Sequence, residues 1–276
     1  MDGHELDQMA AELFTAFSHG EPLAAPPSSM IHSFDIADAY AVADRAAALK
    51  KQAGHLTVGR KVGFANKAMW RLLKLDTLVW GYMWDDTVHQ LAGSDGSLAL
   101  SGMLSPRIEP EVVLRINQTP DLDARDAAWA LKTVEWMALG FEINDCIFPD
   151  WKFKPVDFVA TLGFHKALVI GQPVAVTIDN IETLAGQLAS FKLRLYKNGE
   201  LAAEGAGRNS LRSPALCLTE LANALARQPE AEPLTAGEFV STGTLTDALP
   251  VAPGEEWKAE VEGIALSPLS VRFVAN

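Results

Sequence analysis

The sequence predicts an α+β fold in which a helical N-terminal region precedes a mixed, curled β-sheet. Apolar residues recur at helical spacing in the first 56 residues, whereas from Thr57 onward short tracts with apolar residues on alternate positions are separated by turn residues. Helices and strands do not alternate regularly, which argues against a parallel α/β sheet. We therefore divide the chain into a helical region, 1–56, and a larger β-rich domain, 57–276.

The N-terminal region is predicted to contain two helices. Glu5 to Ser18 has the helical period, and the segment 20–29 is a Pro-rich connector. Ser33-Phe34-Asp35 opens a second, longer helix, because Ser and Asp side chains accept hydrogen bonds from free N–H groups at a helix start. That helix is expected to end near Gly54, where a left-handed cap is easy.

The remainder of the chain is predicted to be mostly β-structure. Two helices are expected, one over Asp126 to Met137 and one begun by Ser213-Pro214. Asn198-Gly199 predicts a tight hairpin turn, since both residues accept positive φ. The expected strands of the hairpin and of the C-terminal part are Phe191 to Tyr196, Glu200 to Ala203, Glu238 to Thr242, Glu256 to Val261 and Leu269 to Val274.

Composition excludes several classes of partner. The formal charge is −12 and the pI is near 4.9, so neither nucleic acid nor an anionic membrane is expected to bind. Cys146 and Cys217 provide no disulfide framework. The first 19 residues lack a basic segment followed by a long apolar one, and no stretch is long enough to cross a bilayer. A cytoplasmic location is therefore expected.

Two glutamates one residue apart are the most informative feature. Glu109 and Glu111 lie in a tract with apolar residues on alternate positions, so both should leave the same face of a strand, with Cα atoms roughly 7 Å apart. One interpretation is a solvated face on which Arg107 and Arg115 pair with the two acids. The other is a cation site, because two close carboxylates in a dry environment need a positive partner.

A third acid supports the cation site. Glu142 lies in the apolar run Met137 to Ile143, and a buried carboxylate needs a partner or a raised pKa. Oxygen ligands suit a hard cation such as Mg²⁺, Mn²⁺ or Ca²⁺ better than zinc, which favours His and Cys.

Two basic side chains have two interpretations each. Lys61, flanked by apolar residues and two glycines, is either a surface residue with its stem on the sheet or a lysine that points into a cleft. His165 stands alone in an apolar tract and is either a hydrogen-bonded core residue or a functional base. The sequence has no Walker motif, no G-x-S-x-G and no zinc-type Cys/His cluster, and Gly205-Ala206-Gly207 lacks the third glycine of a dinucleotide fingerprint.

A series of motifs carries a family resemblance. The chain resembles the 2-keto-4-pentenoate hydratase and 4-oxalocrotonate decarboxylase group of the fumarylacetoacetate hydrolase-like superfamily, from about Val58 to Phe273. The matching segments are Gly59 to Phe64, Trp80-Gly81 with Asp86, Pro106 to Glu111, Glu142 with Asp150-Trp151 and Asp157, Asn198 to Glu200, Gly205 to Gly207, Ser241 to Gly243, and Val261 to Ile264.

The resemblance implies a fold, a cofactor and an activity. It implies a β-roll of the fumarylacetoacetate hydrolase C-terminal type, with 57–276 as the catalytic domain, and a homo-oligomer that can form a complex with a related decarboxylase. It also implies Mg²⁺ or Mn²⁺ on Glu109, Glu111 and Glu142. The implied enzyme is a metal-dependent lyase, hydratase-like, that acts through a metal-bound enolate on small anionic 2-keto or 2-hydroxydienoic acids, as in aromatic catabolism.

The resemblance also assigns roles to single residues. Lys61 is implied as the proton carrier or as the positive group beside the substrate carboxylate, and Asp86 as a second catalytic group, although Asp86 could equally cap a turn. The residues implied in substrate binding are Arg107, Ser241, Thr242 and Gly243.

The chain departs from the hydratase pattern in one segment. Hydratases of this group typically have an Asp-Asn pair and a small serine where this chain has Thr161, Leu162 and Phe164, followed by His165. Enolate chemistry is expected to survive, while the second step and the substrate are open. The alternatives are a carbon-carbon bond hydrolase with His165 as base, a 2-keto acid decarboxylase, and a catalytically silent partner subunit.

Overall fold

The computed structural model describes residues 1–123, 126–228 and 230–276, and within this part of the chain the strands form two sheets. The larger sheet has the order β2-β1-β11-β5-β6-β7-β3, with β12 beside β5 and β8 beside β6. The bounds of its strands are β1 Thr57–Gly63, β2 Val79–Trp84, β3 Val88–Gln90, β5 Arg107–Ile116, β6 Val134–Asn144, β7 His165–Ile170, β8 Val174–Ala175, β11 Phe239–Ser241 and β12 Leu249–Pro250.

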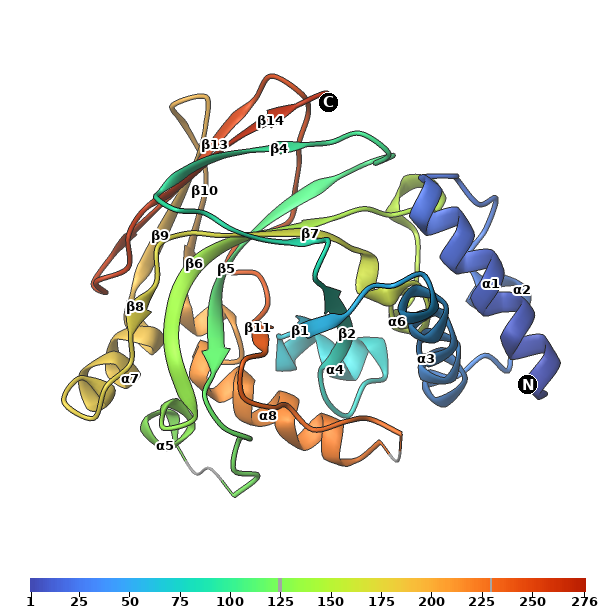
Figure 1. The fold of residues 1–276 in the computed structure, drawn as a ribbon, viewed down its shortest axis with the longest axis horizontal. Coiled ribbons are helices and arrows are strands. Elements are labelled where there is room, and N and C mark those ends of the chain that lie inside the picture. The colour runs from blue at the N-terminus through green and yellow to red at the C-terminus, as the bar shows by residue number, and fades with distance from the viewer. Residues whose placement is uncertain (124–125, 229) are drawn as a thin grey trace.

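The smaller sheet has the order β10-β9-β13-β14-β4. Its strands are β4 Asp95–Ala99, β9 Lys192–Lys197, β10 Glu200–Ala206, β13 Glu256–Glu262 and β14 Leu269–Val274. Figure 1 shows the long strands β5 and β6 curving through the middle of the molecule, with β4, β13 and β14 above them. The predicted α+β fold with a curled sheet is confirmed.

Helices surround the larger sheet. Their bounds are α1 Gly3–His19, α2 Pro27–Met30, α3 Ile36–Gln52, α4 Lys67–Leu73, α5 Ala127–Leu131, α6 Pro155–Ala160, α7 Ile181–Ser190 and α8 Pro214–Ala226, with short 3₁₀ turns η1 Pro149–Trp151, η2 Leu162–Phe164 and η3 Gly207–Asn209. None of the helices in the described residues is long and apolar enough to cross a membrane.

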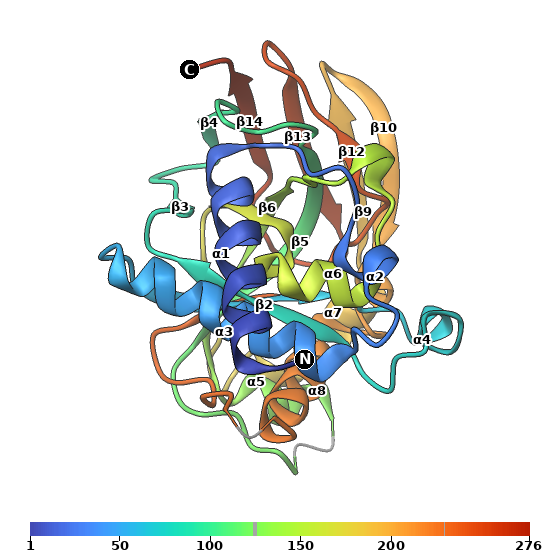
Figure 2. The ribbon, with the colours of Figure 1, turned by 90° about the vertical axis from the view of Figure 1, so that its right-hand side faces the viewer.

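The two long N-terminal helices agree with the sequence analysis. Asp2 and Asp35 cap α1 and α3 through their side chains, and Gly20 ends α1 in the left-handed conformation. Helices α1 and α3 pack together, and α3 packs on α6 (Figure 2). Since these helices share one apolar core with the β-rich part, the boundary between Leu56 and Thr57 remains a proposed division of the chain.

One predicted helix is mostly wrong. Asp126 caps a helix as expected, but α5 has only five residues, and the chain from Val134 to Met137 is already part of β6. Strand β6 pairs with β5, β7 and β8, so tertiary pairing outweighs the local helical pattern. The hairpin prediction is confirmed, because Asn198 and Gly199 have φ of 49° and 84° between β9 and β10.

Both faces of the larger sheet are buried, and they differ in character. Ile108, Val112 and Leu114 of β5 point into the main core. Val113, on the opposite face, belongs to a separate apolar cluster with Met83, Ala138, Leu168, Ile170 and Phe239. Because side chains alternate along a strand, Glu109 and Glu111 share the face of Val113. This enclosed face is therefore apolar at one end and acidic at the other.

Candidate metal centre and active-site cavity

Strand register brings the three predicted acids together. Glu109 lies directly opposite Glu142 in the antiparallel pair β5–β6, and Glu111 lies opposite Gly140. Each glutamate offers a carboxylate oxygen within 4.8 Å of those of the other two. Directly opposed residues of an antiparallel pair have side chains on the same face, so the backbone alone fixes this convergence.

Glu111 is held by the last residue of β11 and by the segment that follows this strand. The Ser241 hydroxyl and the Gly243 N–H both donate to Glu111 Oε2, at 2.5 and 2.8 Å. Gly243 has φ of +92°, and a Cβ there would lie 2.7 Å from the Ala65 Cβ, so only glycine fits. The other oxygen, Oε1, is buried without a hydrogen-bond partner. An unpaired buried oxygen on a carboxylate that lies beside two other acids is the position expected of a cation ligand.

Glu142 is held by three polar side chains. Lys61 Nζ lies 2.9 Å from Oε2, and the ring Nδ1 of His165 lies 2.8 Å from Oε1. Asn144 Nδ2 is 3.3 Å from Oε2 and also donates to Glu109 Oε2 at 2.7 Å. Glu142 is therefore fixed in orientation before any ligand binds.

Only 1% of Lys61 is exposed, so the surface interpretation is wrong, and Lys61 is one of the residues that line a cavity. Its Nζ donates to the Asn144 side-chain oxygen at 2.8 Å and to the Gly163 carbonyl at 3.0 Å, in addition to the contact with Glu142. An ammonium has three N–H groups, and these three acceptors use all of them. These contacts fix the position of the Lys61 Nζ.

The carboxylates carry more negative charge than Lys61 neutralises. Burial, opposed by Lys61, raises the pKa of Glu109 to about 7, and burial together with Glu142 raises the pKa of Glu111 well above its usual value. Burial would also raise the pKa of Glu142, but Lys61 and His165 outweigh it, so that pKa is lowered. Three oxygen donors with this charge fit a hard divalent cation.

Asn144 was not among the predicted site residues, although it links Lys61, Glu109 and Glu142. A signal existed in the sequence. Asn144 stands two residues after Glu142, so on a strand both side chains leave the same face.

His165 lies behind the acidic cluster and is not part of the cavity wall. Its Nδ1 contacts Glu142 and its Nε2 contacts the Thr87 hydroxyl at 3.0 Å. Burial, opposed by Glu142, lowers the pKa of His165, so the ring is neutral and donates from Nδ1. His165 is therefore a hydrogen-bonded residue that orients Glu142.

Asp86 is not brought to the acidic cluster. It forms an ion pair with Lys50 at 2.9 Å on a solvent-facing turn after β2. Arg107 stacks its guanidinium 4.3 Å from the centre of the Trp151 ring at the start of β5. Thr242 is buried, and its hydroxyl donates to the Val112 carbonyl at 2.8 Å, so this side chain is bonded to the backbone of β5. Of these three residues, none contacts the acidic cluster in the hydrogen bonds described.

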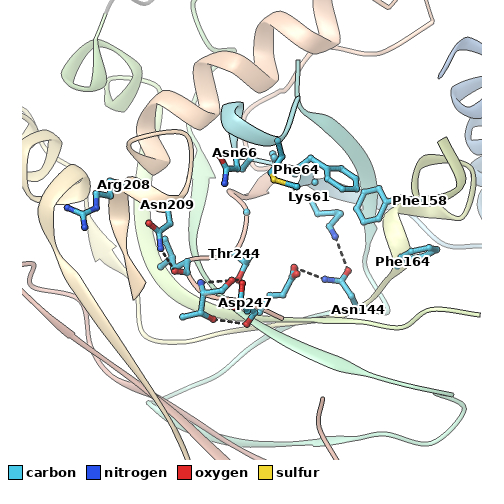
Figure 3. A pocket seen from close by; sticks show the side chains of 18 of the residues that line it. Lys61, Phe64, Asn66, Asn144, Phe158, Phe164, Arg208, Asn209, Thr244 and Asp247 are labelled. Atoms are coloured by element: carbon cyan, nitrogen blue, oxygen red, sulfur yellow. Dashed lines mark hydrogen bonds between the residues drawn. The ribbon is translucent and has the colours of Figure 1, made fainter. Parts of the chain in front are cut away.

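The acids and Lys61 open onto a cavity of about 790 Å³. Figure 3 shows Phe64, Phe158 and Phe164 beside Lys61, and Asn209, Thr244 and Asp247 on the opposite side. A cavity of this size with charged groups at its base can enclose a small organic ligand.

The fold and the site define the class of protein. Residues 78–271 match the family described as fumarylacetoacetate (FAA) hydrolase C-terminal, and the chain belongs to this family. The predicted superfamily is thereby confirmed.

Particular relatives are similar along nearly the whole chain. A 2-hydroxyhexa-2,4-dienoate hydratase of Comamonas testosteroni is 27% identical over 275 residues, which cover 99% of this chain and 98% of the relative. A 4-oxalocrotonate decarboxylase of Pseudomonas sp. (strain CF600) is 28% identical over 239 residues, covering 86% and 85%. Both relatives are named as enzymes, one a hydratase and the other a decarboxylase.

Among solved structures, 4-oxalocrotonate decarboxylase from Pseudomonas putida G7, complexed with magnesium and adipate, superposes with a TM-score of 0.87. The two proteins are 24% identical, and the match covers 99% of each chain. This likeness establishes the fold.

Proposed function

We propose that the protein is a divalent-metal-dependent lyase, hydratase-like, that acts on small 2-keto or 2-hydroxydienoic acids. The observation that carries the proposal is the group of three glutamates within 4.8 Å of one another, with Lys61 2.9 Å from Glu142. A hydratase and a decarboxylase among the relatives support this reaction class.

The proposed cofactor is Mg²⁺, with Mn²⁺ as the alternative, on Glu109, Glu111 and Glu142. When bound there, the ion would neutralise the substrate carboxylate and favour the enol or enolate form of the 2-oxygen. The unpaired Glu111 oxygen supports this placement, because it has no other partner in the described structure.

Lys61 is the proposed proton carrier. In the 2-hydroxydienoate the C2 carbonyl forms as the hydroxyl proton leaves, and a proton is added to a distal carbon. Lys61 can balance this exchange, because it gives one proton to the carbon and its amine then takes the hydroxyl proton. In a hydratase, water then adds across the remaining double bond. Lys61 Nζ stands at the cavity wall as an ammonium and can supply the proton to that carbon. Of its three acceptors, Asn144 is the one with an uncharged side chain, and we propose that this hydrogen bond breaks to free an N–H.

The remaining residues act through the acids. Ser241 and Gly243 fix Glu111, and His165 fixes Glu142, so we propose positioning roles for these residues. We propose no catalytic role for Asp86, because it is paired with Lys50 outside the acidic cluster.

We also propose that the protein works in the cytoplasm as a homo-oligomer. Two free, buried cysteines fit a reducing compartment. Light scattering of the purified protein would test the oligomer, and a monomer would contradict it.

The test of the function is a steady-state assay with Mg²⁺ against 2-hydroxydienoates, oxalocrotonates and acylpyruvates. Loss of the dienol absorbance band reports ketonisation, and mass spectrometry distinguishes added water from lost CO₂ or a cleaved carbon-carbon bond. Turnover that persists after complete chelation, or no turnover of any of these acids, would contradict the proposal.

A further inference from the structure

One side of the cavity is an aromatic wall. It consists of Phe64, Trp151, Phe153, Phe158 and Phe164. Phe164 is at its centre, with ring centroids 4.8 Å from Phe153 and 5.3 Å from Phe158, both edge to face. The wall begins at Lys61, whose Nζ lies 4.6 Å from the centre of the Phe158 ring. An apolar surface thus leads directly away from the acidic cluster.

The wall is built on strained backbone. Phe64, Trp151 and Phe164 have φ of 57°, 56° and 56°, in the left-handed region that bulky residues avoid. Leu162, Gly163 and Phe164 are left-handed in succession. Each such bulky residue costs on the order of 1–3 kcal/mol, a cost that ordinary core packing does not require and that typically occurs at functional sites. The strain favours a binding role for these rings.

The charged residues of the cavity, apart from Lys61 and Glu109, carry no net charge. They are two acids, Glu204 and Asp247, and two bases, Arg208 and Arg212. In Figure 3 the Arg208 guanidinium points away from Lys61. The formal charges of these four residues cancel, so this part of the cavity gives a second carboxylate no net electrostatic attraction.

From the wall, the strain and this charge balance we infer the class of substrate, which rests on the proposed function. The substrate is a monocarboxylate: a 2-hydroxydienoate that carries a planar, apolar substituent such as an aryl ring at the end remote from the carboxylate. The carboxylate end lies at the acidic cluster and Lys61, and the substituent packs on the aromatic wall. Phe153 and Phe64, which are only half-buried, present ring surface to it and determine specificity.

The first test measures binding without turnover. Three saturated acids that share the 2-oxo-carboxylate group are compared by calorimetry in the presence of Mg²⁺. They are 2-oxopentanoate, its 5-phenyl derivative and 2-oxoadipate. We expect the phenyl compound to bind at least about 10-fold more tightly than 2-oxopentanoate, as burial of an apolar group in a pocket provides. Preferred binding of 2-oxoadipate, equal binding of all three, or no binding of any would overturn the inference.

The second test measures the corresponding dienoates as substrates by loss of the dienol band. Turnover that is fastest for the unsubstituted or the carboxylated dienoate would overturn the inference but leave the proposed function standing. If the phenyl 2-oxo acid binds as expected but no dienoate is converted, the proposed reaction fails while the assigned substrate shape is supported.

Variants locate the preference on the wall. Phe153→Ala should reduce the phenyl preference to within about threefold, and Phe153→Leu, which keeps apolar volume, should retain part of it. Phe148→Leu is the matched control, since Phe148 packs 5.9 Å from Phe164 but does not line the cavity. Circular dichroism checks that each variant is folded. An unchanged preference in folded Phe153→Ala would exclude the wall as the determinant.

Discussion

Two groups of side chains in the described structure place possible ligand atoms within 4.8 Å of one another, and they differ in almost everything else. One is the set Glu109, Glu111 and Glu142; the other is His55, Asp85 and Asp86. The first lies on the enclosed face of the sheet, with two members fully buried. The second lies on the surface between α3 and the turn after β2.

The surface group is already satisfied. Asp86 pairs with Lys50, and Asp85 accepts from the Leu56 N–H and from His55. Slight desolvation acts to raise the pKa of Asp85, but these hydrogen bonds outweigh it and the pKa is lowered. In the buried group, two pKa values are raised and one carboxylate oxygen has no partner. We therefore place the proposed metal site at the buried group, where the negative charge is unbalanced, and not at the surface group, whose charges are already paired.

The largest effect is expected from the buried acids. Glu109→Gln and Glu142→Gln should each reduce kcat/KM by about 10³-fold or more, because a charged cation ligand is lost. The melting temperature of the ion-free protein should be kept or raised in Glu109→Gln, since one of three adjacent acids is neutralised. Steady-state kinetics and thermal melts check these expectations. Near-normal activity in either variant would contradict the proposed metal site.

Lys61→Met should lower turnover by roughly 10²- to 10⁴-fold, as loss of an acid-base group does. Methionine keeps much of the apolar stem, but Glu142 loses its cationic partner, so metal affinity must be measured separately by calorimetry. If turnover remained near wild type at saturating Mg²⁺, the proton-carrier role would be refuted.

His165→Ala should weaken Mg²⁺ binding by about 10- to 100-fold, the usual effect of removing a hydrogen bond to a metal ligand. His165→Gln can still donate to Glu142 and should restore part of the affinity. If instead His165 were the base of a second step, Mg²⁺ affinity would be unchanged in both variants and only product formation would fall.

Metal binding should depend on pH. Without an ion, the raised pKa of Glu109, about 7 against an ordinary 4.5, stabilises the fold at low pH, and that contribution is lost as pH rises through about 7. The bound ion needs the ionised carboxylates, so the rise in melting temperature caused by Mg²⁺ should grow from about pH 6 to about pH 8. A constant rise over this range would show that the acids are already ionised without metal.

The smallest effect is expected at the surface group. Asp86→Asn removes an exposed ion pair, which contributes little, so activity and Mg²⁺ affinity should stay within about twofold of wild type. A loss of turnover comparable to that expected for Lys61→Met would support the catalytic role of Asp86 that the family resemblance implied.

The parts of the fold that local chemistry determines were predictable. Capped helices and the Asn198-Gly199 turn depend on neighbouring residues only. The helix expected up to Met137 failed because β6 is stabilised by pairing with strands that are distant in the sequence.

In the candidate site, alternation along a strand predicted that Glu109 and Glu111 share a face, and an acid in an apolar run pointed to Glu142. The placement of Asp86 could not be predicted, because a turn can present its side chains to either side. The strand pattern alone does not show that His165 contacts the back of Glu142.

Because Glu109 lies opposite Glu142 in the pair β5–β6, a change in the length of either strand affects the sheet and the site together. Deletion of one residue within β5 would turn Glu109 and Glu111 toward the apolar core and bring Ile108 to the cavity side. Insertions between β5 and β6, in the stretch that follows Ile116, leave the pairing untouched. A change in the length of that connection can thus leave the acids in place, whereas a single residue gained or lost inside the paired strands disrupts both the sheet and the site.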